Sequence, residues 1–355
     1  MEIESISGDF KFACDASARQ AIAASTTARV LGKSGPPVFP IALGCAAMSG
    51  LRGQVMDDSE SIATIQEAIE RGVNVIDTAD FYGGGHNELL IAQAIKGRRE
   101  KVLLSDKFGG LRSPDGGFVG IDGRPAAVKN FLTYTLTRLG VDYVDIYRLA
   151  RADPQVPVED TIGAISDLIK AGYVRYVGLS EVGPQTIGRA HAVHPICDLQ
   201  IEYSVMARGP EQNIFPTLDE LGIAVTAYGV LMHGLLSGTT EPTGKGDPRS
   251  HLPRFHPENF EHNQKLVWAF GKIAREKGVT NSQLAIAWVL AKGPSIVPVV
   301  GARKRTHLQE ALGSLDFTLS AEDVARIEQT VPAEAVAGSR YDPRLMVMLD
   351  SERTA

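Results

Sequence analysis

Eight short segments of the chain are apolar at almost every position and rich in β-branched residues. They are residues 40–45, 74–79, 101–108, 142–150, 174–180, 197–203, 223–231 and 295–302. Strands of a parallel sheet that are buried on both faces have this continuous hydrophobicity, whereas half-exposed strands alternate apolar and polar residues. We therefore predict eight parallel strands.

Amphipathic segments separate these apolar runs. Several of them close with a glycine just before the next strand, as helices often do at their C-terminus. Examples are residues 58–72, 160–172 and 213–222. Eight strand-then-helix repeats predict an α/β fold, a (β/α)8 TIM barrel, and the count favours it over a doubly wound sheet.

Some stretches lie outside the repeat. Residues 1–26 form an N-terminal extension, for which disorder and packing outside the barrel are both open, and residues 27–355 are expected to form one barrel domain. Residues 28–43 predict a hairpin that closes the bottom of the barrel. The Pro/Gly-rich loop 239–262 is too long for a plain connector, and the tail after about residue 331 is a candidate lid.

The composition mainly excludes certain partners and certain kinds of site. The formal net charge is −6 and no long basic run occurs, so neither nucleic acid nor an anionic membrane is an expected partner. Cys14, Cys45 and Cys197 show no CxxC or Cys/His spacing, so we expect no disulfide framework and no metal. The chain shows no signal-peptide core and no transmembrane-length apolar run. We expect a cytoplasmic protein with a small-molecule partner, and its oligomeric state is left open.

The segment VNVIDTADFYGGG, residues 73–85, delivers Asp77, Asp80 and Tyr82 to the end of the second strand, and Lys107 ends the third. In such barrels the C-terminal ends of the strands build the active site. We expect Lys107 to lower the pKa of Tyr82 from about 10 toward neutrality, and Asp77 to keep the lysine charged. Taken singly, Asp77 is typical of a helix cap, Asp80 is typical of a turn residue, and Lys107 is typical of a surface lysine. Their convergence on adjacent strands favours proton transfer.

A phosphate site is indicated separately after the eighth strand. The segment GARKRTHLQEA begins at Gly301 and places Arg303, Lys304 and Arg305 just before a helix. Barrels commonly bind phosphate at the loops after strands seven and eight, and three cations suit the extra phosphate of NADPH. A solvated basic turn is the alternative. No Rossmann GxGxxG, HExxH, P-loop or GxSxG motif occurs, so a metal, ATP or a serine triad lacks support.

These motifs together resemble the aldo-keto reductase superfamily over residues 28–330. The matching pieces, in order, are IDTADFYGGGHNE, SDKFG, VGLSEV, LQIEYS, YGVLMHGLLSG and VPVVGARKRTHLQEAL. The resemblance implies a barrel that binds NADPH, in preference to NADH, without a Rossmann fold. It also implies a tyrosine acid assisted by lysine and aspartate, which carries over to Tyr82, Lys107 and Asp77.

The resemblance further implies a set of cofactor contacts along the barrel rim. Near the nicotinamide these are Ser180, Glu181, Gln200 and the stacking ring of Tyr228, with Glu181 standing where many members have Asn. Gly44 and Cys45 are also assigned to the cofactor. Near the phosphates and adenosine the contacts are Gly229, Leu231, Gly234, Gly301, Arg303, His307 and Glu310. Ala311 replaces a common Asn, which leaves that adenine contact open.

A larger departure is Ala150, which stands where the family usually has a histidine that orients the carbonyl of the substrate. Neighbouring Tyr147, Arg151 and Asp153 keep the register. Losing one buried polar contact of roughly 1 to 3 kcal/mol slows turnover by about tenfold to a hundredfold. Ala150 and Arg151 are assigned to the substrate pocket, and His86 and His233 are candidate substitutes for the histidine. Some pyridoxal-reductase-type members carry a similar alanine, which makes pyridoxal a candidate substrate.

Three functions follow from these residues. The leading one is NADPH-dependent reduction of an aldehyde or ketone to an alcohol, in which the reverse oxidation is allowed. The second is a cofactor-sensing binding subunit with vestigial catalysis, resembling potassium-channel β subunits. The third is a Schiff-base lyase, because a lysine at a barrel strand end can serve as a nucleophile.

Overall fold

The computed structural model describes residues 28–50, 57–238 and 247–353 of the chain. The predicted N-terminal extension 1–26, and residues 239–246 of the predicted loop 239–262, lie outside the described residues. In the part that is described, no helix is long and apolar enough to cross a membrane.

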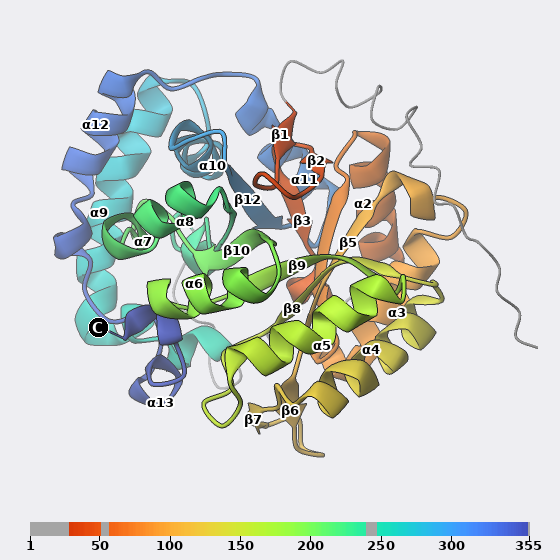
Figure 1. Cartoon of the computed structure of the whole chain (residues 1–355). Coiled ribbons are helices and arrows are strands. Elements are labelled where there is room, and N and C mark those ends of the chain that lie inside the picture. The colour runs from red at the N-terminus through yellow and green to blue at the C-terminus, as the bar shows by residue number, and fades with distance from the viewer. Residues whose placement is uncertain (1–27, 51–56, 239–246, 354–355) are drawn as a thin grey trace, which may run out of the picture.

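Eight parallel strands close into one barrel (Figure 1). They are β3 (Ala42–Gly44), β4 (Val75–Ala79), β5 (Leu103–Phe108), β8 (Val144–Leu149), β9 (Val174–Ser180), β10 (Ile196–Glu202), β11 (Ala224–Tyr228) and β12 (Ile296–Gly301). Pairing of β12 with β3 completes the ring, in which Val299 lies beside Ala42. The prediction of a (β/α)8 barrel is confirmed, and each of the eight apolar runs overlaps one strand.

Helices surround the barrel between successive strands (Figure 1). They are α2 (Asp58–Glu70), α3 (His86–Ala94), α4 (Pro125–Leu139), α5 (Val158–Lys170), α6 (Pro184–Val193), α7 (Pro210–Asn213), α8 (Phe215–Leu221), α9 (Pro257–Glu276), α10 (Asn281–Ala291) and α11 (Arg305–Leu312). The face of α5 that carries Ile162, Ile165 and Leu168 is buried. Helix α8 ends at Gly222, whose φ of 70° is a left-handed conformation that glycine adopts without strain.

An antiparallel hairpin closes the end of the barrel where the strands begin. It pairs β1 (Arg29–Val30) with β2 (Pro37–Val38). Leu31 in its turn is fully buried in an apolar cluster that includes Cys197 and Ala224, from the starts of β10 and β11. The amide of Lys33 donates to the Gly222 carbonyl at 2.8 Å. The active end is therefore the opposite one, where the strands end.

Additions at the active end depart from the sequence prediction. After β5, a second hairpin forms from β6 (Gly110–Arg112) and β7 (Phe118–Ile121), which the strand-then-helix repeat did not include. The loop prediction for 239–262 is wrong for residues 257–262, because α9 begins at Pro257, and proline is tolerated in the first turn of a helix. Before α9, the chain makes short 3-10 turns at Pro248–His251 and Pro253–Phe255.

The C-terminal segment returns to the barrel after a last pair of packed helices. Helix α12 (Ala321–Thr330) packs against α9 at one edge of the molecule (Figure 1). The tail then runs through turns at Ala333–Ala335, α13 (Pro343–Met346) and Asp350–Glu352. Asp350 accepts a hydrogen bond from the amide of Gly183, just after β9. The tail is thus anchored at the active end.

Polar side chains fill the middle of the barrel above the apolar cluster. Arg148 on β8 is fully buried, and its Nη1 contacts Asp198 Oδ2 on β10 at 2.8 Å. Its Nη2 donates to Ser105 Oγ on β5 at 3.0 Å. A Cβ atom at Gly178 would lie 2.9 Å from Arg148 Cζ and 2.8 Å from Asp198 Oδ1, so a side chain on β9 is excluded there. A buried ion pair therefore lies directly beneath the active end.

Candidate active site

Asp77 and Lys107 form a buried ion pair at the ends of β4 and β5. Lys107 Nζ lies 2.6 Å from Asp77 Oδ1, and both residues are 4% exposed. Burial by itself lowers the pKa of Lys107, but the charges of Asp77 and Tyr82 outweigh it and raise that pKa. Because a protonated amine is not a nucleophile, this geometry does not favour a Schiff-base lyase.

Asp77 is held from three sides. Besides Lys107, its carboxylate accepts hydrogen bonds from Ser105 Oγ at 2.9 Å and from Gln200 Nε2 at 2.7 Å. Since the guanidinium of Arg148 can only donate, Ser105 must accept from it and turn its own proton toward Asp77. The barrel interior thus fixes the orientation of Asp77, and through it that of Lys107.

Tyr82 reaches the ion pair from a tight turn after β4. The turn Tyr82–Gly85 contains Gly83 and Gly84 in the left-handed region, at φ of 58° and 62°, where glycine is unstrained. Lys107 Nζ lies 5.3 Å from the centroid of the Tyr82 ring. The structure thus brings Tyr82, Lys107 and Asp77 together.

The expected lowering of the Tyr82 pKa is wrong. Burial raises the pKa of Tyr82 above its ordinary value, although the charge and hydrogen bond of Lys107, and the charge of Arg151, act to lower it. The sequence placed a cation beside the phenol but could not give the depth of burial. A raised pKa keeps the phenol protonated at neutral pH, which a proton donor requires.

Glu181, which follows β9, is enclosed by the C-terminal tail. Arg340 Nη2 lies 2.8 Å from Glu181 Oε2, Ser351 Oγ donates at 2.6 Å, and Tyr228 OH donates to Oε1 at 2.7 Å. Burial alone would raise the pKa of Glu181, but Arg340 is the main influence that lowers it, to about 2. A side-chain contact was expected here with the nicotinamide, whereas this carboxylate is an ion-pair partner of the tail.

Sequence reasoning missed the tail residues of this site. Arg340 also contacts Glu202 Oε2 at 3.4 Å, and Tyr341 OH lies 2.9 Å from Tyr228 OH. Arg254, from the 3-10 turn before α9, contacts Glu202 Oε1 at 3.4 Å. These residues lie far from β9 to β11 in sequence. The unusual acid at 181 was the only local signal that a distant cation is required.

Ala150 and Arg151 lie where β8 ends. Ala150 is buried, and its amide donates to the Phe108 carbonyl at 2.9 Å. Arg151 Nη1 donates to the Ala150 carbonyl at 2.6 Å and to Ser180 Oγ at 3.3 Å. Of the two candidate substitute histidines, His86 instead contacts Ser49 Oγ at 3.0 Å and Asp58 Oδ2 at 3.1 Å.

The backbone after β9 and β11 is strained. Among the described residues, the non-glycine positions with positive φ are Glu181, Met232 and His233, at 53°, 48° and 55°. Such conformations cost about 1–3 kcal/mol each and tend to occur at functional sites. The strained turn Met232–Gly234 belongs to the segment Leu231 to Gly234 that was assigned to cofactor phosphates.

The glycines and Cys45 that were assigned to the cofactor also lie at the ends of strands or just after them. Gly44 ends β3, and Gly301, which pairs with it, ends β12. Cys45 donates its amide to the Asp77 carbonyl at 2.9 Å, and burial raises the pKa of its thiol, so it is not a reactive thiolate. Gly229 has a φ of 69°, and a Cβ atom there would lie 2.9 Å from Glu202 Cγ.

The cationic segment at the start of α11 is partly neutralised by α2. The Arg305 amide donates to Glu60 Oε1 at 2.9 Å, and its Nη2 lies 3.1 Å from Glu60 Oε2. Burial, followed by the charge of Arg303, lowers the pKa of His307. Glu310 lies one turn further along the same helix. Arg303, Lys304 and His307 lie at this helix start, where an anionic phosphate is favoured.

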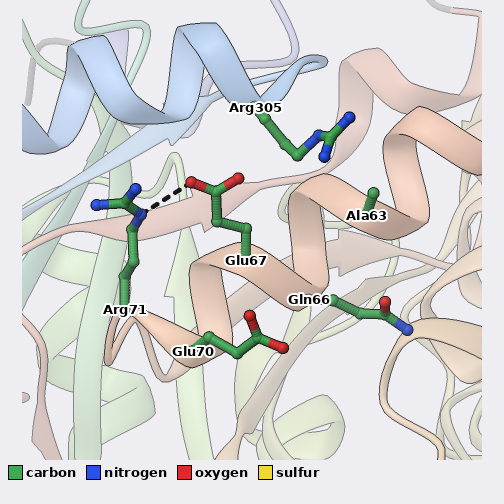
Figure 2. A pocket seen from close by; sticks show the side chains of 6 residues that line it. All are labelled: Ala63, Gln66, Glu67, Glu70, Arg71 and Arg305. Carbon is green, nitrogen blue, oxygen red and sulfur yellow. Dashed lines mark hydrogen bonds and ion pairs between the residues drawn. The ribbon is translucent and has the colours of Figure 1, made fainter.

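Two hollows flank the barrel. One of about 500 Å³ lies on the outside between α2 and α11, where Glu67 forms an ion pair with Arg71 and the Arg305 side chain points away from both (Figure 2). The other, of about 1130 Å³, is at the active end, between the β6–β7 hairpin, the loop after β8 and the tail. Its lining includes Leu111, Val119, Ile121, Ala152, Val347 and Met348. The second hollow lies at the end of the barrel that carries the candidate site, although Asp77, Tyr82 and Lys107 are not among its lining residues.

No candidate metal centre is found in the ranges 28–50, 57–238 and 247–353, because no three His, Cys, Asp or Glu side chains converge there. The cofactor implied by the fold instead needs hydrogen-bond donors, a ring face and a cationic phosphate site. Ser180 and Gln200 supply the donors, Tyr228 supplies the ring, and the start of α11 supplies the cations. The residues present therefore fit a nicotinamide dinucleotide.

Comparisons with known proteins agree with this arrangement. The model of the aldo/keto reductase family matches residues 40–332. A Glycine max protein named "Probable aldo-keto reductase 1" is 37% identical over 314 residues, covering 88% of this chain and 90% of that protein.

Solved structures of similar fold give the same result. A glycerol dehydrogenase from Gluconobacter oxydans superposes with a TM-score of 0.80 at 27% identity, covering 90% of this chain and 99% of that one. An aldo/keto reductase from Klebsiella pneumoniae, solved in complex with NADP and acetate, gives a TM-score of 0.70 at 25% identity, covering 88% and 98%. The chain therefore belongs to the aldo/keto reductase family, whose members are NAD(P)H-dependent oxidoreductases acting on carbonyl and alcohol groups.

Proposed function

We propose that this protein reduces an aldehyde or ketone with NADPH and that Tyr82 is the proton donor. The observation that carries the proposal is the 2.6 Å contact of Lys107 with Asp77, with the Lys107 ammonium 5.3 Å from the centre of the Tyr82 ring. This triad lies at the strand ends of a closed barrel, where such enzymes bind their substrates.

The reaction needs one hydride and one proton. When bound, NADPH supplies the hydride to the carbonyl carbon. Tyr82 donates its phenolic proton to the carbonyl oxygen, which yields the alcohol. Lys107 then stabilises the phenolate that remains, and solvent returns the proton to Tyr82. Asp77 keeps Lys107 charged and in place throughout.

Residues around the rim would hold the cofactor. Ser180 and Gln200 are the proposed amide contacts, and Tyr228 offers its ring face beside them. The strained turn Leu231 to Gly234 and the cations Arg303 and Lys304 are the proposed phosphate contacts. Support for NADPH over NADH comes from these cations, which suit an additional phosphate group, and from the NADP present in the Klebsiella pneumoniae relative.

The substrate proposal follows from Ala150. With a methyl group in place of an imidazole, the pocket gains space beside the carbonyl and loses a hydrogen-bond donor. We therefore keep pyridoxal, a bulky aromatic aldehyde, as a candidate substrate together with simpler aldehydes and ketones.

The experiment measures NADPH consumption with 4-nitrobenzaldehyde, pyridoxal and acetone. We expect turnover of at least one aldehyde by the wild type. Tyr82→Phe should lower kcat by at least about a hundredfold, because general acid catalysis contributes roughly 10²- to 10⁴-fold. Tyr134→Phe is the matched control, since Tyr134 is 55% exposed on α4. Undiminished turnover in Tyr82→Phe refutes the assignment.

One observation, the alanine at position 150, favours a second function. A cofactor-sensing subunit would tolerate the loss of the histidine because its turnover is not selected. Its signature is tight NADPH binding with very slow oxidation across the whole aldehyde panel, and turnover of pyridoxal or 4-nitrobenzaldehyde within ordinary enzyme rates excludes it.

A further inference from the structure

Unlike the buried cations beside it, Arg151 has no carboxylate that neutralises it. Among the residues that the structure describes, none lies within ion-pair distance of Arg151. Its only hydrogen bonds there are those from Nη1 to the Ala150 carbonyl and to Ser180 Oγ. Three of its five N–H groups, those on Nε and Nη2, make no hydrogen bond to these residues.

The neighbouring cations show the contrast. Each contacts a carboxylate: Lys107 with Asp77, Arg148 with Asp198, Arg254 with Glu202 and Arg340 with Glu181. Glu181 is the carboxylate with the strongest influence on Arg151, but its oxygens accept hydrogen bonds from Arg340, Ser351 and Tyr228. The N–H groups on Nε and Nη2 of Arg151 are therefore left to receive the oxygens of an anion.

We propose that Arg151 binds a carboxylate carried by the substrate, so that the preferred substrates are aldehyde acids or oxo acids. The inference rests on the proposed carbonyl reduction and narrows its substrate class. A guanidinium presents Nε and Nη2 in a planar fork that matches both oxygens of a carboxylate.

The surroundings of Arg151 provide room for such a substrate. Ala150, the preceding residue, has no side chain beyond a methyl group, and Ala152, the next residue, lines the hollow of about 1130 Å³. Tyr82 lies within electrostatic range of Arg151. Arg151 and Tyr82 do not line this hollow themselves, so it gives room beside Arg151 and not at the triad. A substrate whose carboxylate is held by Arg151 would present its carbonyl to Tyr82. The anchor also compensates for the orienting contact that the missing histidine does not make.

The test compares benzaldehyde with 4-carboxybenzaldehyde, which carries an additional para carboxylate, by kcat/KM with NADPH. We expect the wild type to favour 4-carboxybenzaldehyde by at least about tenfold. Arg151→Gln should reduce this ratio by about 10- to 100-fold, the range of a charge-assisted hydrogen bond. Arg151→Lys should restore part of the ratio. Arg112→Gln is the control, because it removes a cation from the exposed β6–β7 hairpin at the same end, and it should leave the ratio unchanged.

Other outcomes decide the proposal as well. Equal kcat/KM for both aldehydes in the wild type overturns it. An equal fall for both in Arg151→Gln, with weaker NADPH binding by fluorescence titration, makes Arg151 a cofactor-positioning residue through Ser180 and also overturns it.

A failure of the proposed function is recognised separately. If the wild type reduces neither aldehyde, calorimetry measures instead how tightly benzoate and benzyl alcohol bind to the protein in complex with NADP. Benzoate binding that is lost in Arg151→Gln supports the anion site without catalysis, and absence of benzoate binding refutes it.

Discussion

Removing Arg148 should destabilise the barrel strongly, because its partner Asp198 would remain charged in the interior. Both side chains are 0% exposed, and their contact is 2.8 Å. In Arg148→Met, the side-chain hydrogen-bond donors that Asp198 keeps among the described residues are the Thr226 hydroxyl, at 2.5 Å, and the Cys197 thiol, at 3.2 Å. Breaking one side of a buried ion pair costs about 3–5 kcal/mol.

The corresponding change in Tm follows from the size of the chain. An unfolding entropy of about 2.1 cal/mol/K per residue gives roughly 0.7 kcal/mol/K for 355 residues. Arg148→Met should therefore lower Tm by about 4–7 °C. Arg71→Met is the control: its ion pair with Glu67 is half exposed, so its loss should cost less than about 1 kcal/mol.

A double-mutant cycle separates the charge effect from the loss of packing. Asp198→Asn leaves Arg148 unpaired, whereas the combination of Asp198→Asn with Arg148→Met leaves no uncompensated charge. The double variant should therefore lose at least about 2 kcal/mol less than the sum of the two single losses. Urea unfolding followed by circular dichroism at neutral pH measures each free energy. Additive losses, or single losses below about 1 kcal/mol, refute the reasoning.

Two further predictions concern buried carboxyl groups. Burial, with a contribution from the charge of Glu88, raises the pKa of Asp80 from 3.8 to about 7. The stability that protonated Asp80 contributes is therefore fully present below the pKa of the unfolded state and is lost as pH rises through about 7. Asp80→Asn cannot ionise and should reduce the fall in Tm between about pH 5 and pH 8, whereas unchanged pH dependence contradicts this. Arg340→Met leaves Glu181 buried without its main cation and should lower the free energy of unfolding in urea by about 3–5 kcal/mol. The control Arg353→Met removes an exposed cation and should cost less than about 1 kcal/mol. Similar losses in both variants would show that the ion pair is not the reason.

The central part of the site could be predicted because it is local to the strand ends. Continuous apolar runs fix eight buried strands, and the rule that strand ends meet at one rim places Asp77 and Lys107 together. Their 2.6 Å contact joins adjacent strands, and the glycines after Tyr82 indicate the turn that carries the phenol. The motifs, in this order, were also sufficient to identify the family.

Other features depend on contacts between distant segments and on depth of burial. The sequence does not show that Arg340 reaches Glu181, 159 positions away, or that Arg148 points into the barrel toward Asp198. Nor does it give the sign of the pKa shift of Tyr82, which is a balance between desolvation and the nearby cations. Hydrophobic periodicity therefore determined the fold and the residues at its rim. The electrostatics of the site were decided by tertiary structure, because they depend on distances and solvent exposure that arise only when the barrel closes.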